Sequence, residues 1–516
     1  MATLHPHNRP RWRTALGLAS LALSLAGCPQ PPDTADRMHA PALVLTNGVV
    51  LANAGAKTLD ILAPKGAEVA VTHLAYARTD SQRLVTADGK RAVMLDSTGR
   101  VLTVTDAVTT KTIALPTEFA GLASSDDGLA VALWHPQQGG LGTTLVNSDE
   151  VALVDLDKPA GKGNPTLTTL PSLGKAPLRA RITAPIDAAD GKHRILWAET
   201  QGRIGIADFT PAGTVRALTV PLSAQTQSAI TPTRTLVRTS AGKADLYLVA
   251  SGLNDVVHIA IDLGGAQLTA TLDQVAAGAN PVDLHLFDPK EGLRALTANF
   301  GSKALGLLDP STGTGLEIPL AVSVSKFVAV AGNDGKQRLF GWFAGASVAA
   351  GYVVDLDDLP KKKGKALRRL DFSAGVTSVT VASHLLLVQL GSTAAPLALV
   401  NPQTGNITEF QGTGGIRGVL ATTVQTAPTA YVLGETSTGL RLSRIDLTTL
   451  AGTTANVALT GAQHLVPLGT SGVAVLGGGG GWGNWALAAP QGALDTAKLR
   501  FVEGFALDGL LQQEAP

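Results

Sequence analysis

Short runs of apolar residues alternate with tight polar turns along most of the chain. The clearest example is residues 304–313, which read Ala-Leu-Gly-Leu-Leu-Asp-Pro-Ser-Thr-Gly. A short apolar run bounded by turn residues predicts a β-strand. In the turn, the side chain of Asp309 can accept hydrogen bonds from the backbone ahead of it, Pro310 presets φ, and Gly313 supplies the positive φ of the exit. We therefore interpret this unit as a strand that runs into a tight turn.

The unit recurs along the chain, with close variants at residues 151–155, 352–355 and 397–405. Ten such strands can be placed, and they end at Ala63, Asp106, Asp155, Asp208, Asp262, Asp309, Asp355, Asn401, Asp446 and Ala489. Successive ends lie 43 to 54 residues apart. A period of this length with four strands in each period is typical of a β-propeller blade. The sequence thus predicts an all-β protein, a β-propeller of about ten four-stranded repeat units, arranged in one large ring, a smaller ring or two rings.

Two consecutive repeats predict individual strands. In the first repeat they are expected at residues 267–272, 281–287, 293–299 and 304–309, and in the second at residues 316–320, 325–331, 337–343 and 349–355. Turn residues separate all of these segments, so chance alternation does not explain the agreement between the two repeats.

The ends of the repeat region predict how the ring closes. Before the first turn only residues 43–51 and 58–63 have the pattern of strands, where a full blade needs three. The last outer strand is expected at residues 498–503, and an apolar segment remains at residues 505–511. Propellers can close by letting a terminal strand complete the first blade, which removes an exposed sheet edge. We expect residues 505–511 to be that latch.

The composition narrows the classes of function. The chain of 516 residues has 57 Gly, 45% hydrophobic residues and 4% aromatic residues, which suits many short strands joined by tight turns. Its 41 basic and 40 acidic residues leave a net charge of +1, so the basic excess of a nucleic-acid-binding protein is missing and we expect no nucleic-acid partner. A single cysteine, Cys28, excludes an intramolecular disulfide and a cysteine-based metal site.

Cys28 lies at the end of a predicted export signal. Three arginines precede an apolar run at residues 15–26. This run is shorter than the roughly 20 residues of a membrane span and has the layout of a signal peptide. The sequence Leu-Ala-Gly-Cys at residues 25–28 resembles the lipobox of bacterial lipoproteins, in which a peptidase cuts before the cysteine and the cysteine is then acylated. The resemblance implies a signal peptide at residues 1–27 and a stable lipid anchor on Cys28.

A Pro-rich polar tether is predicted at residues 28–41. Position 29 is Pro rather than the Asp that favours inner-membrane retention in enteric lipoproteins, so we expect an outer-membrane location in the cell envelope, on its periplasmic or its surface face. The alternative is an ordinary signal peptide with an incidental cysteine. Against it, the only cysteine of the chain occupies the position that the lipobox requires.

The repeats resemble a known class of propeller. The turn Asp-Pro-x-Thr-Gly or Asn-Pro-x-Thr-Gly after a Val- and Leu-rich strand is similar to that of bacterial repeats of the YVTN and WD40-like kind. The similarity extends as a pattern over residues 40–512, without the Gly-His and Trp-Asp dipeptides of eukaryotic WD40 blades. The resemblance implies a propeller fold for residues 42–512.

Residues 477–483, five glycines followed by Trp and Gly, form the most unusual local sequence. A phosphate-binding P-loop would need a following Lys and a Ser or Thr that opens a helix, and the sequence has neither. We interpret the run as a hairpin turn between strands at residues 473–476 and 484–488, because Gly tolerates any turn geometry. Trp482 and Trp485 are then candidates for an exposed aromatic lip of a binding surface.

Lys361, Lys362 and Lys363 begin a dense basic cluster between two predicted strands. Such a run is usually a solvated loop, and aspartates close by in the sequence offset its charge. Contact with an anionic lipid or sugar is the functional alternative for these lysines.

The sequence contains no complete catalytic or metal-binding constellation. The ten histidines are scattered without a His-Glu-x-x-His motif, and the acidic pairs that follow the strands ending at Asp155 and Asp355 do not continue into a calcium-binding loop. Gly-x-Ser-x-Gly is missing, and a Ser-x-x-Lys at residues 240–243 stands in a polar turn without further motif partners. We therefore expect no cofactor and no metal, and an enzymatic activity is less favoured than a binding role.

The longest insertion, residues 137–148, lies between the second and third strands of one blade, and loops on such a rigid frame often carry binding residues.

We interpret the protein as a lipid-anchored envelope protein whose propeller is a non-catalytic scaffold for binding a protein or a glycan. Two alternatives are open. One is envelope assembly, by resemblance to the propeller lipoprotein of the outer-membrane β-barrel insertion machine. The other is a lactonase-like or lyase-like propeller enzyme that uses a metal in its central channel.

Overall fold

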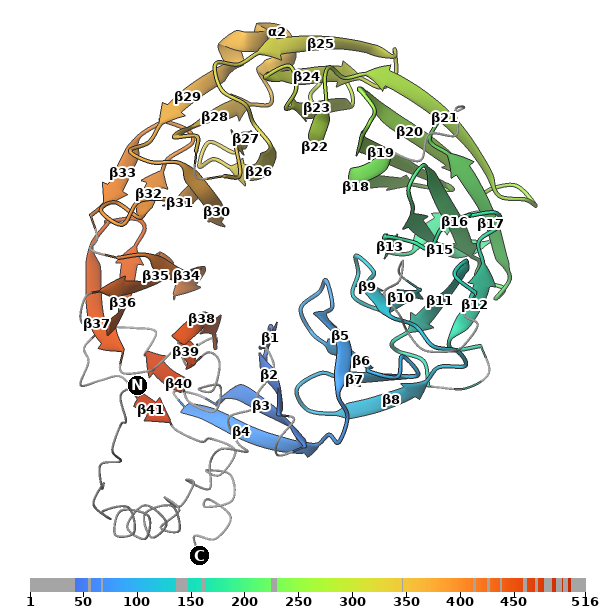
Figure 1. Ribbon diagram of the computed structural model, residues 1–516, viewed down its shortest axis with the longest axis horizontal. Coiled ribbons are helices and arrows are strands. Elements are labelled where there is room, and N and C mark those ends of the chain that lie inside the picture. The colour runs from blue at the N-terminus through green and yellow to red at the C-terminus, as the bar shows by residue number, and fades with distance from the viewer. Residues whose placement is uncertain are drawn as a thin grey trace, which may run out of the picture.

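The computed structural model describes residues 42–502, with gaps at 54–56, 66–67, 136–146, 160, 162, 224–229, 346, 412–413, 425–426, 437–438, 458–461, 469–471, 478–484, 489–493 and 495–499. The described strands form ten antiparallel sheets that stand side by side around one ring (Figure 1). We number these sheets blade 1 to blade 10 in chain order. The first strand of each blade lies nearest the axis of the ring and the last lies at its periphery (Figure 1).

The strands of the first five blades are as follows. Blade 1 contains β1 (Leu43–Leu45), β2 (Gly48–Asn53), β3 (Thr58–Lys65) and β4 (Glu68–Ala75), and blade 2 contains β5 (Asp80–Val85), β6 (Ala92–Asp96), β7 (Val101–Thr105) and β8 (Thr110–Ala114). Blade 3 contains β9 (Gly121–Ser124), β10 (Ala130–Trp134), β11 (Glu150–Asp155) and β12 (Thr166–Thr169). Blade 4 contains β13 (Arg179–Ile182), β14 (Ile186–Ala188), β15 (Gly191–Glu199), β16 (Arg203–Phe209) and β17 (Val215–Pro221), and blade 5 contains β18 (Thr231–Ser240), β19 (Lys243–Ser251), β20 (Asp255–Asp262) and β21 (Thr269–Ala276).

The remaining five blades follow in the same order. Blade 6 contains β22 (Pro281–Phe287), β23 (Arg294–Asn299), β24 (Ala304–Asp309) and β25 (Thr314–Pro319), and blade 7 contains β26 (Lys326–Ala331), β27 (Gln337–Trp342), β28 (Ala350–Asp355) and β29 (Leu367–Asp371). Blade 8 contains β30 (Val376–Ala382), β31 (Leu385–Leu390), β32 (Leu397–Val400) and β33 (Ile407–Phe410). Blade 9 contains β34 (Ile416–Val424), β35 (Ala427–Thr436), β36 (Gly439–Asp446) and β37 (Gly452–Val457), and blade 10 contains β38 (Ala462–Pro467), β39 (Val473–Gly477), β40 (Trp485–Ala488) and β41 (Arg500–Val502).

Nine of the blades are plain four-stranded sheets, whereas in blade 4 the short strand β14 pairs with β15 as a fifth strand. The predicted all-β β-propeller is therefore confirmed, but with nine four-stranded blades and one five-stranded blade rather than about ten four-stranded units. The strands predicted in the two repeats between residues 267 and 355 agree with β21 to β28 to within a few residues at each end.

The recurring strand-and-turn unit is the third strand of a blade together with the turn that follows it. In blade 6, Oδ1 of Asp309 accepts the backbone N–H of Ser311 at 3.0 Å. In blade 8, Oδ1 of Asn401 accepts that of Gln403 at 2.9 Å, and Gly405 completes the turn with a φ of 81°. The predicted roles of the turn carboxylate or amide and of the turn glycine are confirmed.

The hydrophobic core is divided among the junctions between neighbouring blades, because the middle strands are apolar on both faces. Five consecutive residues are buried in β24 and again in β28. At the junction of blades 7 and 8, Phe340 and Val353 pack in one cluster with Leu386 and Val388. Burial of each such side chain contributes about 1.5–3 kcal/mol. A blade is therefore stabilised on both faces by its two neighbours.

The first and last blades close the ring by side-chain packing. Val49 and Leu51 of β2 share a hydrophobic cluster with Val466 and Ala474 of blade 10. The expectation that blade 1 lacks a strand is wrong, because residues 43–51 form the hairpin β1–β2 and not one strand. An Asn-Gly pair reverses the chain inside that apolar stretch, which is a known hairpin signal. The predicted latch, residues 505–511, lies outside the described residues.

A helix of one turn, α2 (Leu359–Lys362), and the 3-10 turn η2 (Lys363–Ala366) follow β28 at the outer edge of the ring (Figure 1). The side chain of Leu359 is buried in the cluster that joins blades 6 and 7, where it packs with Leu305 and Leu339. Among the described residues, no helix is long and apolar enough to cross a bilayer.

A charged network ties blade 4 to blade 5. In β15, the buried His193 lies between two carboxylates, with Nδ1 2.9 Å from Oδ1 of Asp208 and Nε2 2.7 Å from Oδ1 of Asp190. Nε of Arg216 donates to Asp208 at 2.8 Å, and its Nη2 donates to the carbonyl oxygen of Leu263 in blade 5 at 3.0 Å. Burial by itself lowers the pKa of His193, but the hydrogen bonds to the two carboxylates outweigh burial and raise the pKa. The network therefore favours the charged imidazolium.

This network predicts a pH-dependent contribution to stability. Because the pKa of His193 is higher in the folded chain than the value of about 6.5 in the unfolded chain, its stabilisation is complete below about pH 6.5 and is lost as the pH rises through the folded pKa. The substitution His193→Gln should therefore lower the free energy of unfolding by about 1–3 kcal/mol at about pH 5.5, and by less at about pH 8. Urea unfolding across this range measures the difference.

A matched control is His384→Gln, at the turn between β30 and β31, because it removes a histidine that lies outside this network. A constant gap between the wild-type and His193→Gln curves at all pH values would contradict the charged-network interpretation.

Candidate functional site

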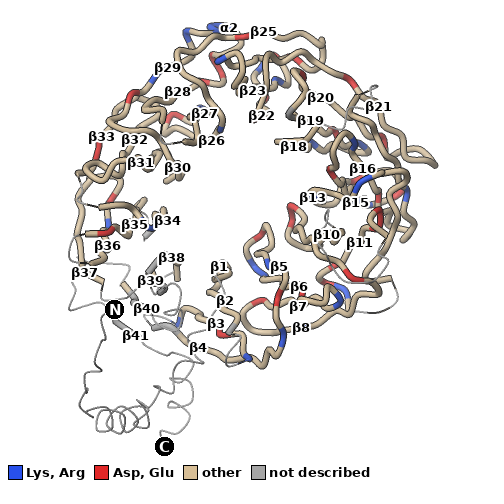
Figure 2. The backbone as a smooth tube through the Cα atoms, in the orientation of Figure 1, with Lys and Arg blue, Asp and Glu red and all other residues tan. Residues whose placement is uncertain are grey.

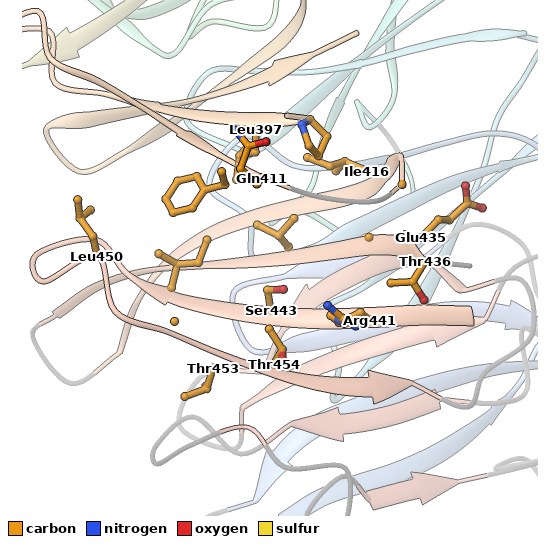
Figure 3. A pocket seen from close by; sticks show the side chains of 17 residues that line it. Leu397, Gln411, Ile416, Glu435, Thr436, Arg441, Ser443, Leu450, Thr453 and Thr454 are labelled. Carbon is orange, nitrogen blue, oxygen red and sulfur yellow. The ribbon is translucent and has the colours of Figure 1, made fainter. Parts of the chain in front are cut away.

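A groove of about 330 Å³ opens at the junction between blades 8 and 9 (Figure 3). Its walls come from the outer strands of blade 8, β32 and β33, and from β35, β36 and β37 of blade 9. This volume is in the range of pockets that hold a small molecule or a short stretch of another chain.

Small side chains on one face of blade 9 leave the groove open. Neighbouring positions two apart on a strand share a face, so Val432 and Gly434 of β35 point the same way. Across the ladder, Val432 pairs with Ser443 and Gly434 pairs with Arg441. A Cβ added to Gly434 would meet the carbonyl oxygen of Gly415 at 3.8 Å, an ordinary contact, and the space beyond is open. The groove is thus a consequence of Gly and Ser at positions where bulkier side chains would close the junction.

The lining combines apolar and polar side chains. The apolar members include Leu397, Phe410, Ile416, Val432, Ile445 and Leu450, and the polar members include Gln411, Thr436, Arg441, Ser443, Thr453 and Thr454. Among the described residues the guanidinium of Arg441 has no ion-pair partner, whereas the carboxylate of Glu435 is held by Nε of Arg417 at 2.7 Å. The groove therefore offers apolar contact together with one available cation and several hydroxyls (Figure 3).

Leu450, at one end of the groove, stands where the corresponding turns of blades 6 and 8 have Gly. In blade 8 the fourth residue after Asn401 is Gly405, whose N–H donates to the carbonyl oxygen of Asn401 at 2.8 Å. In blade 9 the fourth residue after Asp446 is Leu450, and its N–H makes the same bond to Asp446, also at 2.8 Å. Leu450 takes the conformation of the glycine, with a φ of 61°.

This left-handed conformation costs a residue other than Gly about 1–2 kcal/mol. The side chain that causes the cost is 41% exposed, at the left end of the groove in Figure 3. Strained residues of this kind concentrate at ligand-binding sites, where contact with the ligand outweighs the strain. The packing of blade 9 therefore does not explain why Leu450 has both a strained backbone conformation and an exposed apolar side chain.

The predicted basic cluster lies elsewhere, on α2 and η2 beside blade 7. Nζ of Lys361 lies 2.6 Å from Oε1 of Glu291, and Nζ of Lys362 lies 2.8 Å from Oδ2 of Asp358. The hydrogen bond to Glu291 raises the pKa of Lys361. Lys363 connects α2 to η2 with a positive φ of 51°. Carboxylates thus offset the charge of two of the three lysines, and their contact with an anionic partner stays a prediction.

The other predicted site residues are not brought to the groove. Cys28 and Trp482 lie outside the described residues, and so does most of the insertion at residues 137–148. Trp485 belongs to β40 of blade 10, whereas the lysine cluster belongs to blade 7, so the two predicted binding elements are on different blades.

Three tryptophans and one turn aspartate have structural roles. Trp134, Trp197 and Trp342 are buried in β10, β15 and β27, each in the strand next to the innermost strand of its blade. Oδ1 of Asp155 accepts the N–H of Asp157 at 3.0 Å in the turn after β11, which is the predicted turn carboxylate. In the part of the chain that the structure describes, no three His, Cys, Asp or Glu side chains are grouped so that they could hold a metal ion.

Sequence reasoning missed the groove, although one signal for it was present. Aligning the ten turns places Leu450 where the turns of blades 6 and 8 have Gly, and that mismatch is readable without a structure. Arg441, Ser443 and Gly434 gave no signal, because their position on one face beside an open junction depends on the register of β35 and β36.

Comparisons with known proteins bear on the fold only. No protein-family model and no curated protein sequence matches this chain. Among solved structures, the Dos1 propeller is 11% identical with a TM-score of 0.39, over 70% of this chain and 90% of that chain. Apo AztD from Citrobacter koseri is 11% identical with a TM-score of 0.34, over 78% and 92% of the two chains. A eukaryotic initiation factor is 10% identical with a TM-score of 0.44, over 79% and 93%. At these values the similarity says nothing about what this chain binds.

Proposed function

We propose that this protein is a lipid-anchored binding scaffold of the cell envelope, whose groove between blades 8 and 9 holds a segment of a partner protein. The lipobox-like sequence that ends at Cys28 supports the anchor, and the Pro-rich residues that follow it would space the propeller from the membrane. The role is one of binding and not of catalysis.

The observation that carries the proposal is Leu450 in the place of a turn glycine. The strain and the exposure of its side chain are both unfavourable for the isolated fold. Burial of the Leu450 side chain by a partner would contribute about 1–2 kcal/mol to the free energy of binding. Apolar hot spots of this kind dominate the affinity of many interfaces.

A protein segment fits the lining better than a glycan does. Apolar residues of the groove, among them Phe410 and Ile416, would contact a hydrophobic side chain of the partner segment. Arg441, which also lines the groove, would pair with an acidic side chain of the same segment (Figure 3). Among the described residues that line the groove, Phe410 is the one aromatic side chain, so they offer no broad aromatic platform on which a sugar ring could stack. We therefore favour a partner segment with an apolar and an acidic residue close together.

The anchor is tested by substitution of the cysteine. The variant Cys28→Ala should lose acylation and move from the detergent phase to the aqueous phase when cells are extracted, because nothing else in the proposal holds it to the bilayer. Phase partitioning followed by mass spectrometry of the N-terminal peptide is the measurement. The variant Pro29→Asp keeps the cysteine and should stay in the detergent phase. Equal partitioning of Cys28→Ala and wild type would remove the anchor from the proposal.

The groove is tested by two substitutions that act in different ways. Leu450→Gly removes the apolar contact and relieves the strained φ, so its stability should stay within about 1 kcal/mol of wild type. Gly434→Val fills the open space beside Gly415. Both should reduce capture of the partner from solubilised envelopes by about tenfold or more, measured by affinity purification and quantitative mass spectrometry.

The matched control is Leu316→Ala, which removes another exposed leucine, 39% exposed on β25 in blade 6. It should capture the same partner as wild type. Undiminished capture by Leu450→Gly, or an equal loss in Leu316→Ala, would show that the groove is not the binding site. Recovery of the barrel-insertion machine as the captured partner would make the scaffold an assembly factor.

A further inference from the structure

The lining of the groove between blades 8 and 9 alternates along β36 with the period of a strand. Arg441, Ser443 and Ile445 line the groove, whereas Leu442 between them packs in the cluster shared by blades 9 and 10. Residues two apart on a strand share a face, so the three lining side chains form a row along the face of blade 9 that meets blade 8. The floor of the groove is therefore a strip of sheet whose chemistry changes at every second residue.

Each of these three residues belongs to a row of neighbours across the sheet. The pairing of β36 with β35 and β37 places Gly434 and Asn456 beside Arg441, Val432 and Thr454 beside Ser443, and Ala430 and Gly452 beside Ile445. One row thus carries a cation, the middle row two hydroxyls, and the third row only apolar groups. Figure 3 shows the same order, with Leu450 at one end of the groove, Ser443 in the middle and Arg441 toward the other end.

The apolar end of the groove is built by both blades. Ile445 shares a hydrophobic cluster with Leu397 and Phe410 of blade 8, and all three line the groove. Leu450 lies just beyond the row of Ile445, in the turn that joins β36 to β37, with its side chain 41% exposed. This end suits an apolar side chain of a ligand.

The polar end has donors that the described residues do not use. Among these residues, the exposed guanidinium of Arg441 and the hydroxyls of Ser443 and Thr454 have no hydrogen-bond or ion-pair partner. Glu435 also lines the groove, but Nε of Arg417 donates to its carboxylate at 2.7 Å. One cation is therefore available to an acidic group at this end, and two hydroxyls are available to a polar group beside it.

The distance between the two ends favours an extended ligand. A strand rises about 3.4 Å per residue, so the rows of Ile445 and Arg441 are about 14 Å apart along β36. In an extended segment that lies along β36, residues two and four positions apart face successive rows, in whichever direction the segment runs. One turn of a helix about 10 Å wide occupies about 420 Å³. This exceeds the groove, which has a volume of about 330 Å³.

We propose that the groove binds an extended segment of the partner in which an apolar and an acidic residue are four positions apart, with a small polar residue midway between them. This inference rests on the proposed function of the groove and specifies the sequence that it recognises. The acidic residue pairs with Arg441, the polar one meets the hydroxyls of Ser443 and Thr454, and the apolar one covers Leu450. Both signs of charge occur around the whole ring, so the acid is selected by contact with Arg441 and not by a broad basic face (Figure 2).

The test is fluorescence anisotropy of the purified propeller at low ionic strength with labelled synthetic peptides. The probes are serine- and threonine-rich peptides that carry one leucine and one aspartate two, four or seven positions apart, where seven is the spacing of one helix face. The peptide with a spacing of four should bind wild type at least about fivefold more tightly than the other two. Replacing its aspartate by asparagine should weaken binding by about fivefold, because a charge-assisted hydrogen bond is lost.

Variants of the two ends separate their roles. Arg441→Met should bind the aspartate and asparagine peptides equally, and Arg441→Glu should prefer a peptide with lysine in place of the aspartate at the same spacing. Leu450→Gly should bind every peptide more weakly but keep the preference for aspartate over asparagine. The matched control is Arg444→Met, on the same strand, at a position that does not line the groove. It should bind as wild type does.

The inference is overturned if the tightest binding occurs at another spacing, if spacing has no effect, or if no peptide binds saturably up to about 5 mM. An equal loss in Arg444→Met and Arg441→Met would also overturn it. The groove itself is tested separately by capture of the partner. Reduced capture by Leu450→Gly together with peptide binding that ignores spacing would keep the groove as the binding site and remove only the spacing.

Discussion

Each blade of this ring is apolar on both of its faces, and the rest of the structure depends on that constraint. A sheet with one apolar face can lie on a single neighbour, but a sheet buried on both faces needs two. With ten such sheets in one chain, a closed ring leaves no terminal apolar face uncovered. The contact between Val49 of blade 1 and Val466 of blade 10 is therefore of the same kind as every other junction and not a special seal.

Because stability is distributed over junctions, each junction can differ from the others at a local cost. Where blade 7 meets blade 8, large side chains such as Phe340 fill the space, and where blade 6 meets blade 7, Leu359 of the helical turn enters the core. At the junction of blades 8 and 9, Gly434 and Ser443 leave the outer part open. Repeats whose energy is a sum of neighbour contacts tolerate one such opening without losing the ring.

The sequence predicted the fold well because its strongest signals are local. The turn carboxylate, amide and glycine interact only with backbone groups within about five residues. The roles of Asp309 and Asn401 could therefore be assigned from sequence alone, and these turns in turn marked where the third strands end. The hairpin of blade 1 was missed because an apolar stretch on both sides of Asn47-Gly48 has the pattern of one long strand. The β-bulge near the start of β30 in blade 8 was invisible for a related reason, since its extra residue, Thr377, changes the register of pairing with β31 but not the composition of the strand.

The candidate site could not be predicted to the same extent, since it depends on what separate blades place side by side. Phe410 of blade 8 and Arg441 of blade 9 line the same groove, and neither stands in a recognisable motif. Only the packing of blade 8 against blade 9 brings them to one groove.

Leu450 shows how a departure from a shared turn can mark a site. In the turns of blades 6 and 8 the fourth residue after the turn Asp or Asn is Gly, which takes the positive φ without strain, as Gly405 does. Leu450 takes the same conformation at a cost in strain, and its side chain is 41% exposed at the groove. A positive φ alone does not indicate a site, because Lys303 and Ser383 adopt it as well and do not line the groove. The combination of strain, an exposed apolar side chain and an open groove is what favours a bound partner at Leu450.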